Sequence, residues 1–270
     1  MPEAEQKSTY LLAGQAPELE RLQLQSRVWE PAGEELLNSL PARLDRALEV
    51  GCGAMGWLRI LSRWVNPGGS VVGTDIDDRM LAAAQSLVSA EGLTNISLVR
   101  DNLFESQLPR ASFDLVHARF QIAPLGRARE QMAAFLSLAK PDGWIVLEEP
   151  DISSWRINPD SPATERLIEL IRRGFAAAGG DFSAGRTLPA LLREYALRPE
   201  VTARVIALEP GHPYLRLPLQ FAASLRPRLE VLEAPDTIND LLRVAEDELS
   251  VEGAWGTTFT LIQASARLSS

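Results

Sequence analysis

The eight residues from Glu49 to Gly56, Glu-Val-Gly-Cys-Gly-Ala-Met-Gly, constrain the fold more than any other part of the chain. They follow a short apolar run at residues 46–50 and precede residues 57–65, whose apolar spacing is helical. Glycines where a strand turns into a helix allow a tight turn and let the backbone approach a ligand closely. The same spacing also fits a tight turn without a ligand, so its meaning depends on the rest of the chain.

Strand and helix patterns alternate on both sides of this turn. The predicted strands are 46–50, 70–74, 96–99, 113–118 and 144–148, and the predicted helices between them are 57–65, 77–90 and 128–139. Asp77 is placed to cap the second of these helices, and Pro141-Asp142-Gly143 predicts a turn. Such alternation indicates an α/β fold with a mainly parallel sheet.

The flanks of this region are richer in helical patterns. Residues 18–40 have helical spacing that we expect to be broken at Pro31, because proline has no N–H to donate. After Asp151 the predicted helices are 163–178, 188–195, 215–225 and 238–249, and the predicted strands are 201–208 and 257–268. We therefore expect four segments: a helical extension at 1–43, an α/β core at 44–150, a helical lid at 151–200, and the end of the core sheet with intervening helices at 201–270.

The composition argues against several classes of protein. Lysine and arginine number 27 and aspartate and glutamate 36, so the net charge is −9 and long nucleic acids are poor partners. A single cysteine, Cys52, excludes a disulfide within the chain, and two distant histidines, His117 and His212, argue against a metal site. No apolar run of about 18 residues predicts a membrane span, and residues 1–7 do not resemble a signal peptide. We expect a cytoplasmic protein.

Acidic residues stand where three successive strands are predicted to end. Glu49 lies at the end of the first, Asp75 follows Gly56 by 19 residues at the end of the second, and Asp101 follows the third. In a parallel sheet these positions share one crevice. A carboxylate at Asp75 suits ribose hydroxyls and one at Asp101 suits an amino group, so the pattern predicts a nucleoside-containing ligand.

Two details favour S-adenosylmethionine over a nicotinamide dinucleotide. The Glu49 carboxylate would repel a pyrophosphate but attract the positively charged amino end and sulfonium of S-adenosylmethionine, while the helix after the glycines offers its N-terminus to the methionine carboxylate. A long segment also precedes the turn, whereas a nicotinamide-binding domain often begins with it. A nicotinamide-dependent oxidoreductase stays an alternative, because it uses the same glycines and ribose carboxylate.

Five segments resemble the motifs of class I S-adenosylmethionine-dependent methyltransferases of the bacterial small-molecule type. They are L-E-V-G-C-G-A-M-G at 48–56, V-V-G-T-D-I-D at 71–77, V-R-D-N-L-F at 99–104, F-D-L-V-H-A-R at 113–119 and K-P-D-G-W-I-V-L-E-E at 140–149. The resemblance covers residues 44–151 and is weaker at 10–22. It implies a Rossmann-like, seven-stranded, mostly parallel sheet with helices on both faces, a helical N-terminal extension and a helical lid insertion after the fifth strand.

The resemblance also implies a cofactor contact for each motif residue. In chain order these are Tyr10 closing over the ligand, Glu49 reaching the amino group through water, Gly51, Gly53 and Gly56 under the methionine moiety, Asp75 on both ribose hydroxyls, Ile76 against adenine, Asp101 on the adenine amino group, Asn102 through its backbone N–H, and Ala118 and Arg119 beside the methionine end. The family often has a histidine shortly after the position of Arg119. This chain has Phe-Gln-Ile-Ala-Pro at 120–124 instead, so no basic residue is expected there.

Most of these positions also have a purely structural interpretation. Glu49 fits a charged strand end, Asp101 and Asn102 fit turn formers, and Arg119 fits a surface ion pair. His117 falls inside a predicted central strand, where a hydrogen-bonded core histidine competes with a role as the single candidate for a catalytic base.

The implied activity is methyl transfer to a small aromatic or lipophilic metabolite in natural-product biosynthesis, leaving S-adenosylhomocysteine. The protein would mainly align acceptor and methyl carbon and exclude water. Trp29, Phe120 and Trp155 are the predicted lining of the acceptor pocket, although such aromatic residues also form cores.

The expected partner is the small acceptor, with neither nucleic acid nor membrane, and a homodimer stays open. Besides the oxidoreductase, one alternative activity is a cyclisation or rearrangement in which the bound sulfonium helps electrostatically without methyl transfer.

Overall fold

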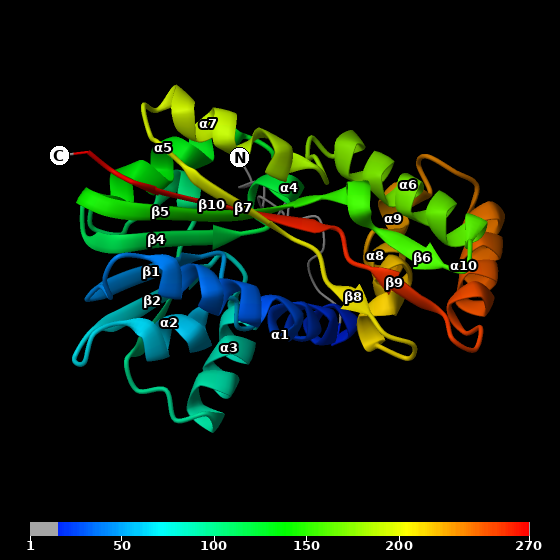
Figure 1. Cartoon of the computed structure of the whole chain (residues 1–270), viewed down its shortest axis with the longest axis horizontal. Helices are drawn as coiled ribbons and strands as arrows, with labels where there is room; N and C mark the ends of the chain where they lie inside the picture. Colours follow the sequence, from blue (N-terminus) through cyan, green and yellow to red (C-terminus); the bar gives the residue numbers. More distant parts are fainter. Residues whose placement is uncertain (1–15, 270) are drawn as a thin grey trace, which may run out of the picture.

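Seven strands form one sheet within residues 16–269, the part of the chain that the structure, a computed structural model, describes (Figure 1). Its order is β3-β2-β1-β4-β5-β10-β7. The strands are β1 (Arg46–Val50), β2 (Ser70–Asp75), β3 (Ile96–Arg100), β4 (Phe113–Arg119), β5 (Ala139–Asp151), β7 (Glu200–Arg204) and β10 (Thr260–Arg267). Strands β1 to β5 are parallel, and β10 runs antiparallel between β5 and β7. The predicted mostly parallel α/β fold is confirmed.

Helices cover both faces of this sheet and extend beyond one end of it. They are α1 (Ala16–Ser39), α2 (Leu58–Trp64), α3 (Asp78–Ala90), α4 (Ile122–Leu125), α5 (Ala128–Leu138), α6 (Pro162–Ala177), α7 (Leu188–Glu194), α8 (Leu217–Ser224), α9 (Arg226–Leu229) and α10 (Pro235–Leu249). Short 3-10 turns are η1 (Leu103–Glu105), η2 (Ile152–Ser154), η3 (Ala184–Thr187) and η4 (Pro213–Arg216). Asp77 caps α3, as predicted, by accepting the Arg79 N–H at 2.9 Å.

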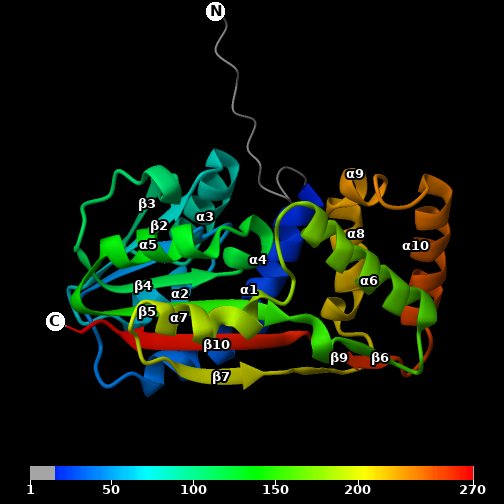
Figure 2. The same ribbon diagram turned by 90° about the horizontal axis from the view of Figure 1, so that it is seen from above.

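Three apolar clusters hold these layers together. One joins α2, α3 and the second half of α1 to one face of the sheet, and another joins α5 and α7 to the opposite face. The third lies among α6, α8 and α10, beyond the carboxyl ends of the parallel strands. Figure 2 shows α1 between the sheet and this helical cluster. No helix among residues 16–269 is both long and apolar enough to span a membrane.

A second sheet was not predicted. It contains β6 (Arg156–Asn158), β9 (Trp255–Thr257) and β8 (Ala207–Leu208), with β9 in the middle. The single strands predicted at 201–208 and 257–268 each divide in two, because the chain crosses from one sheet to the other within each run. The predicted turn at 141–143 lies inside β5 as an irregularity in its pairing with β4.

The prediction that the first helix breaks at Pro31 is wrong. Helix α1 continues through this residue to Ser39. Trp29 is completely buried before the proline, and Leu36 and Leu37 are buried after it. Proline inside a helix costs about 3 kcal/mol, but burying each large apolar side chain stabilises by roughly 1.5–3 kcal/mol, so packing on both sides outweighs the lost hydrogen bond. The division into four segments stays a prediction.

Candidate functional site

A cavity of about 340 Å³ lies at the carboxyl edge of the sheet, where the sheet meets α1 and the helical cluster. Glu49, Asp75 and Asp101 all line it, at the ends of three neighbouring parallel strands. The three carboxylates therefore share one crevice, as the strand pattern predicted.

The turn after β1 brings backbone against this cavity. Gly51, Gly53 and Gly56 all line it, with φ angles of +62°, +53° and +49°. Side chains other than hydrogen are strained in this left-handed region. The N–H of Cys52 donates to the carbonyl of Thr74 on β2 at 2.7 Å, which ties the turn to the neighbouring strand.

Asp75 is held at the end of β2 by backbone donors. Its Oδ2 accepts the N–H of Gly53 and its Oδ1 accepts the N–H of Asp77, both at 2.9 Å. Burial raises the pKa of Asp75, although these bonds partly offset the effect. The next residue, Ile76, lines the cavity with 42% of its surface exposed, which leaves an apolar side chain without protein cover.

Asp101 and Asn102 both line the cavity and both shape the loop after β3. Asp101 Oδ1 accepts the Gln107 N–H at 3.0 Å, and Asn102 Oδ1 accepts the Phe104 N–H at 3.2 Å. The turn-forming interpretation is confirmed. It does not conflict with ligand contact, because each side chain keeps unused hydrogen-bonding capacity.

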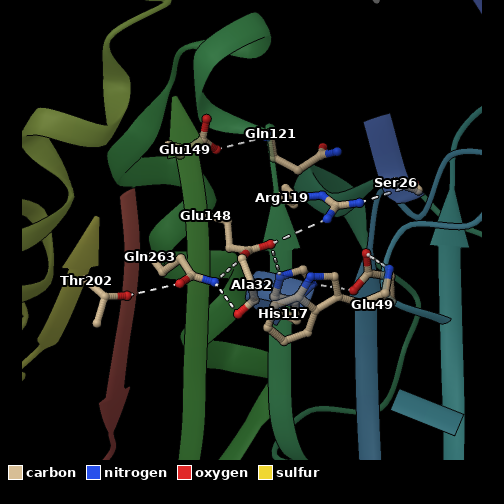
Figure 3. Close-up of polar contacts among 11 residues, drawn as sticks. Ser26, Ala32, Glu49, His117, Arg119, Gln121, Glu148, Glu149, Thr202 and Gln263 are labelled. Atoms are coloured by element: carbon tan, nitrogen blue, oxygen red, sulfur yellow. Dashed lines mark hydrogen bonds and ion pairs between the residues drawn. The ribbon is translucent and has the colours of Figure 1, made fainter. Parts of the chain in front are cut away.

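Glu49 lies below the glycine turn, where it is almost fully buried and lines the cavity. Its Oε1 accepts the Trp57 N–H at 3.0 Å, and its Oε2 contacts Nδ1 of His117 (Figure 3). His117 is completely buried on β4, does not line the cavity, and has Nε2 3.3 Å from Glu148 Oε2. The core-histidine interpretation therefore fits its position, and direct contact with an acceptor does not.

Arg119 ends β4 and lines the cavity with only 5% of its side chain exposed. Its Nη2 donates to Ser26 Oγ on α1 at 3.2 Å, and its Nη1 lies 3.9 Å from Glu148 Oε2. A buried position rules out the surface ion pair that the sequence left open. Its neighbour Ala118 is buried and does not line the cavity.

The segment after Arg119 is fixed by a buried carboxylate on β5. Glu149 accepts the N–H groups of Gln121, Ile122 and Ala123 at 2.9, 2.6 and 2.9 Å. Its burial raises the pKa to about 8, although these three bonds partly offset the effect. Phe120, just before these donors, lines the cavity with φ +55°, a strained conformation that clusters at functional sites.

Five phenylalanines line the part of the cavity away from the glycine turn: Phe120, Phe175, Phe182, Phe221 and Phe259. Phe120 lies in the cavity lining and its contact with an acceptor stays a prediction, whereas Trp29 and Trp155 do not line the cavity, so their predicted positions are wrong. Both tryptophans lie in the core of the helical cluster, completely or almost completely buried. Trp29 donates its indole N–H to the Tyr214 hydroxyl at 3.2 Å, because its face of α1 points at that core rather than at the cavity.

Sequence reasoning missed the polar residues that α1 contributes to the cavity. Arg21, Gln25 and Ser26 line the cavity, and Arg21 donates to Gln25 at 2.8 Å and to Glu18 at 2.9 and 2.6 Å. The spacing of Glu18, Arg21 and Gln25 along the helix would have indicated a polar stripe within an otherwise apolar face. Phe221 and Phe259 were missed because they come from distant segments.

Tyr10 lies outside the described residues. Among residues 16–269, no three histidine, cysteine, aspartate or glutamate side chains are grouped as metal ligands.

In the comparison with known proteins, one family model matches part of this chain. Residues 47–143 match the model of a methyltransferase domain. Demethylmenaquinone methyltransferase of Geobacillus kaustophilus is 33% identical over 104 residues, which cover 38% of this chain and 44% of the relative. Nocamycin O-methyltransferase of Saccharothrix syringae is 32% identical over 137 residues, 48% of this chain and 49% of the relative. The chain thus spans about half the length of the curated relatives it matches.

The fold is also found in solved structures. A SAM-dependent methyltransferase from Aquifex aeolicus superposes with a TM-score of 0.54 over 72% of this chain and 93% of the other, at 19% identity. At that identity the likeness concerns the fold alone. The matched domain agrees with the segment, residues 44–151, in which the motifs were recognised.

Proposed function

Because the chain contains a methyltransferase domain on a class I fold, we propose that it binds S-adenosylmethionine and transfers the methyl group to a small acceptor. The observation that carries this proposal is the crevice in which the glycine turn, Glu49, Asp75 and Asp101 lie together. The resulting product would be S-adenosylhomocysteine.

The cavity fits the parts of this cofactor. An uncovered apolar side chain, Ile76, stands beside Asp75, which suits an adenine next to a ribose. Asp101 and Asn102 lie at the same end and would hold the adenine edge. At the other end, a carboxylate under a glycine turn suits an ammonium group and would repel a pyrophosphate, which favours S-adenosylmethionine over a dinucleotide.

The acceptor would lie beyond this site, among the phenylalanines of the helical cluster. Their aromatic surfaces favour an aromatic or lipophilic body. Arg119 lines the cavity between the cofactor crevice and the phenylalanines, and it would face either the methionine end of the cofactor or a polar group of the acceptor. Nocamycin O-methyltransferase and demethylmenaquinone methyltransferase, by their names, methylate small molecules, which supports this class of acceptor.

The bound cofactor supplies a methyl carbon already activated by positive sulfur. The chain's own residues align the acceptor against it and keep water out, since α1 and the helical cluster lie over the crevice. No base is assigned, because the one candidate, His117, lies behind the cavity wall.

The proposal also covers the class of acceptor, the location of the protein and its oligomeric state. An acceptor enclosed by phenylalanines and a net charge of −9 favour a small molecule over nucleic acid. Natural-product biosynthesis, a cytoplasmic location and the possibility of a homodimer stay predictions.

Calorimetry tests the cofactor directly. Purified protein should bind S-adenosylhomocysteine and S-adenosylmethionine and should not bind NAD. Binding of NAD alone would favour the oxidoreductase, and release of S-adenosylhomocysteine with a methylated product separates methyl transfer from a cyclisation that leaves the cofactor intact.

A further inference from the structure

A line of buried charged groups crosses the sheet directly behind the cavity (Figure 3). It joins Glu49 on β1, His117 and Arg119 on β4, and Glu148 on β5, all less than 9% exposed. Burying this many ionisable groups is costly unless each is paired. The line therefore calls for an explanation beyond packing.

The geometry fixes the charge of the imidazole. Nδ1 of His117 contacts Glu49 Oε2, and Nε2 lies 3.3 Å from Glu148 Oε2. An ionised carboxylate only accepts hydrogen bonds, so both ring nitrogens must donate and the ring must be an imidazolium. The indole of Trp57 stacks on the ring with centroids 3.6 Å apart, which favours a cation.

The neighbouring groups agree with this charge. Burial alone lowers the pKa of His117, but the charges of Glu49 and Glu148 and their hydrogen bonds raise it further than burial lowers it. The other oxygen of Glu148, Oε1, accepts from the Gln263 amide at 2.7 Å, and the Arg119 guanidinium lies 3.9 Å from Oε2. The charges along the line thus alternate: carboxylate, imidazolium, carboxylate, guanidinium.

Glu49 and Arg119 line the cavity, whereas His117 and Glu148 lie behind its wall. Glu49 has both oxygens oriented, one by the Trp57 N–H and the other by His117. We propose that His117 is a positioning residue, which holds the Glu49 carboxylate in place and directs it toward the amino group of the cofactor. This inference rests on the proposed function, and it assigns a role to a residue that touches neither cofactor nor acceptor.

Substituting His117→Gln tests the idea, because glutamine is neutral and can donate to one carboxylate only. Glu49 then loses the cation that pairs with its Oε2 and orients it. Binding of S-adenosylhomocysteine at pH 7 should weaken about 10- to 150-fold, as expected for one lost charge-assisted hydrogen bond.

Binding of a second ligand distinguishes a loss of Glu49 orientation from a general disruption of the site. 5′-Methylthioadenosine has the same nucleoside but no amino-acid tail, so its affinity should be the same in wild type and variant. His212→Gln, which changes the histidine that caps η4 far from the line, is the matched control and should leave both affinities unchanged. Equal losses for both ligands, or no loss at all, would each overturn the role of His117.

The wild-type protein offers an independent measurement. NMR of the two imidazole side chains, assigned with His212→Gln, should show His117 doubly protonated from pH 6 to 8. A neutral His117 ring at pH 7 overturns the inference even if the His117→Gln variant fails to fold. The proposed function is tested separately, by calorimetry on the wild type alone. If the wild-type protein does not bind S-adenosylhomocysteine, the proposed function itself is refuted.

Discussion

Two glycines of the turn make a matched pair for testing how the site is built. Gly53 and Gly56 have nearly the same φ, +53° and +49°, and both line the cavity. They differ in what a Cβ would meet. At Gly53 the nearest atom is Leu22 Cδ1 at 4.0 Å, whereas at Gly56 a Cβ would overlap Glu49 Oε1 and lie 3.0 Å from the Cys52 carbonyl oxygen.

The two alanine variants should therefore differ in stability by a calculable amount. Gly53→Ala adds only the strain of a left-handed L-residue, about 1–2 kcal/mol. Gly56→Ala adds the same strain and also displaces the buried Glu49 carboxylate from the Trp57 N–H, at a further cost of about 1.5–3 kcal/mol. The total for Gly56→Ala is about 3–5 kcal/mol.

Urea unfolding of the ligand-free proteins measures this difference. The denaturant slopes of the two variants should match that of the wild type, so that the midpoints report stability. If the two variants lie within about 0.5 kcal/mol of each other, well below the cost of about 1.5–3 kcal/mol expected for displacing Glu49, the argument that Glu49 is fixed by contact with Gly56 fails.

Three further outcomes are expected. Asp75→Asn should weaken S-adenosylhomocysteine binding by calorimetry about tenfold or more, whereas Asp77→Asn, which alters the cap of α3 and the exposed ion pair with Arg79, should not. Glu149 has a folded-state pKa of about 8 against an ordinary 4.5; the folded state binds that proton more tightly, so its stabilising contribution is complete below about pH 4.5 and is lost as the pH rises through 8. Thermal unfolding should show this decline, and Glu149→Gln should flatten it. Phe259→Ala should destabilise the protein by about 3–5 kcal/mol in urea and raise KM for the acceptor more than KM for the cofactor, and the reverse order would place the acceptor elsewhere.

The sheet could be predicted from the sequence because its parallel strands are short apolar runs with clear turn signals between them. Residues 46–50 were predicted as a strand with the bounds the structure gives. The second sheet could not, because its strands contain two or three residues each and pairing between distant segments leaves no local pattern. Pro31 misled the helix prediction because local propensity competes with burial on both sides of it.

Some residues of the site could likewise be predicted from the sequence, and others could not. Glu49, Asp75 and Asp101 were found because strand ends of a parallel sheet meet at one edge whatever the rest of the chain does. Trp29 and Trp155 were misplaced because the sequence around a tryptophan indicates that its side chain is buried without showing which layer it packs against. The pairing of His117 with two carboxylates depends on strand order and register, β1-β4-β5, which no spacing in the sequence specifies.

Several partners of helix α1 lie near the far end of the chain. Trp29 donates to a hydroxyl 185 residues later, Ser224 donates to Glu18, and the Gln263 amide donates to the Ala32 carbonyl. During ribosomal synthesis at roughly 5–20 residues per second, these contacts can form only on the order of 10–40 s after the helix itself has been made. Until then, the apolar face that contains Trp29 lacks the late segments that bury it in the finished fold.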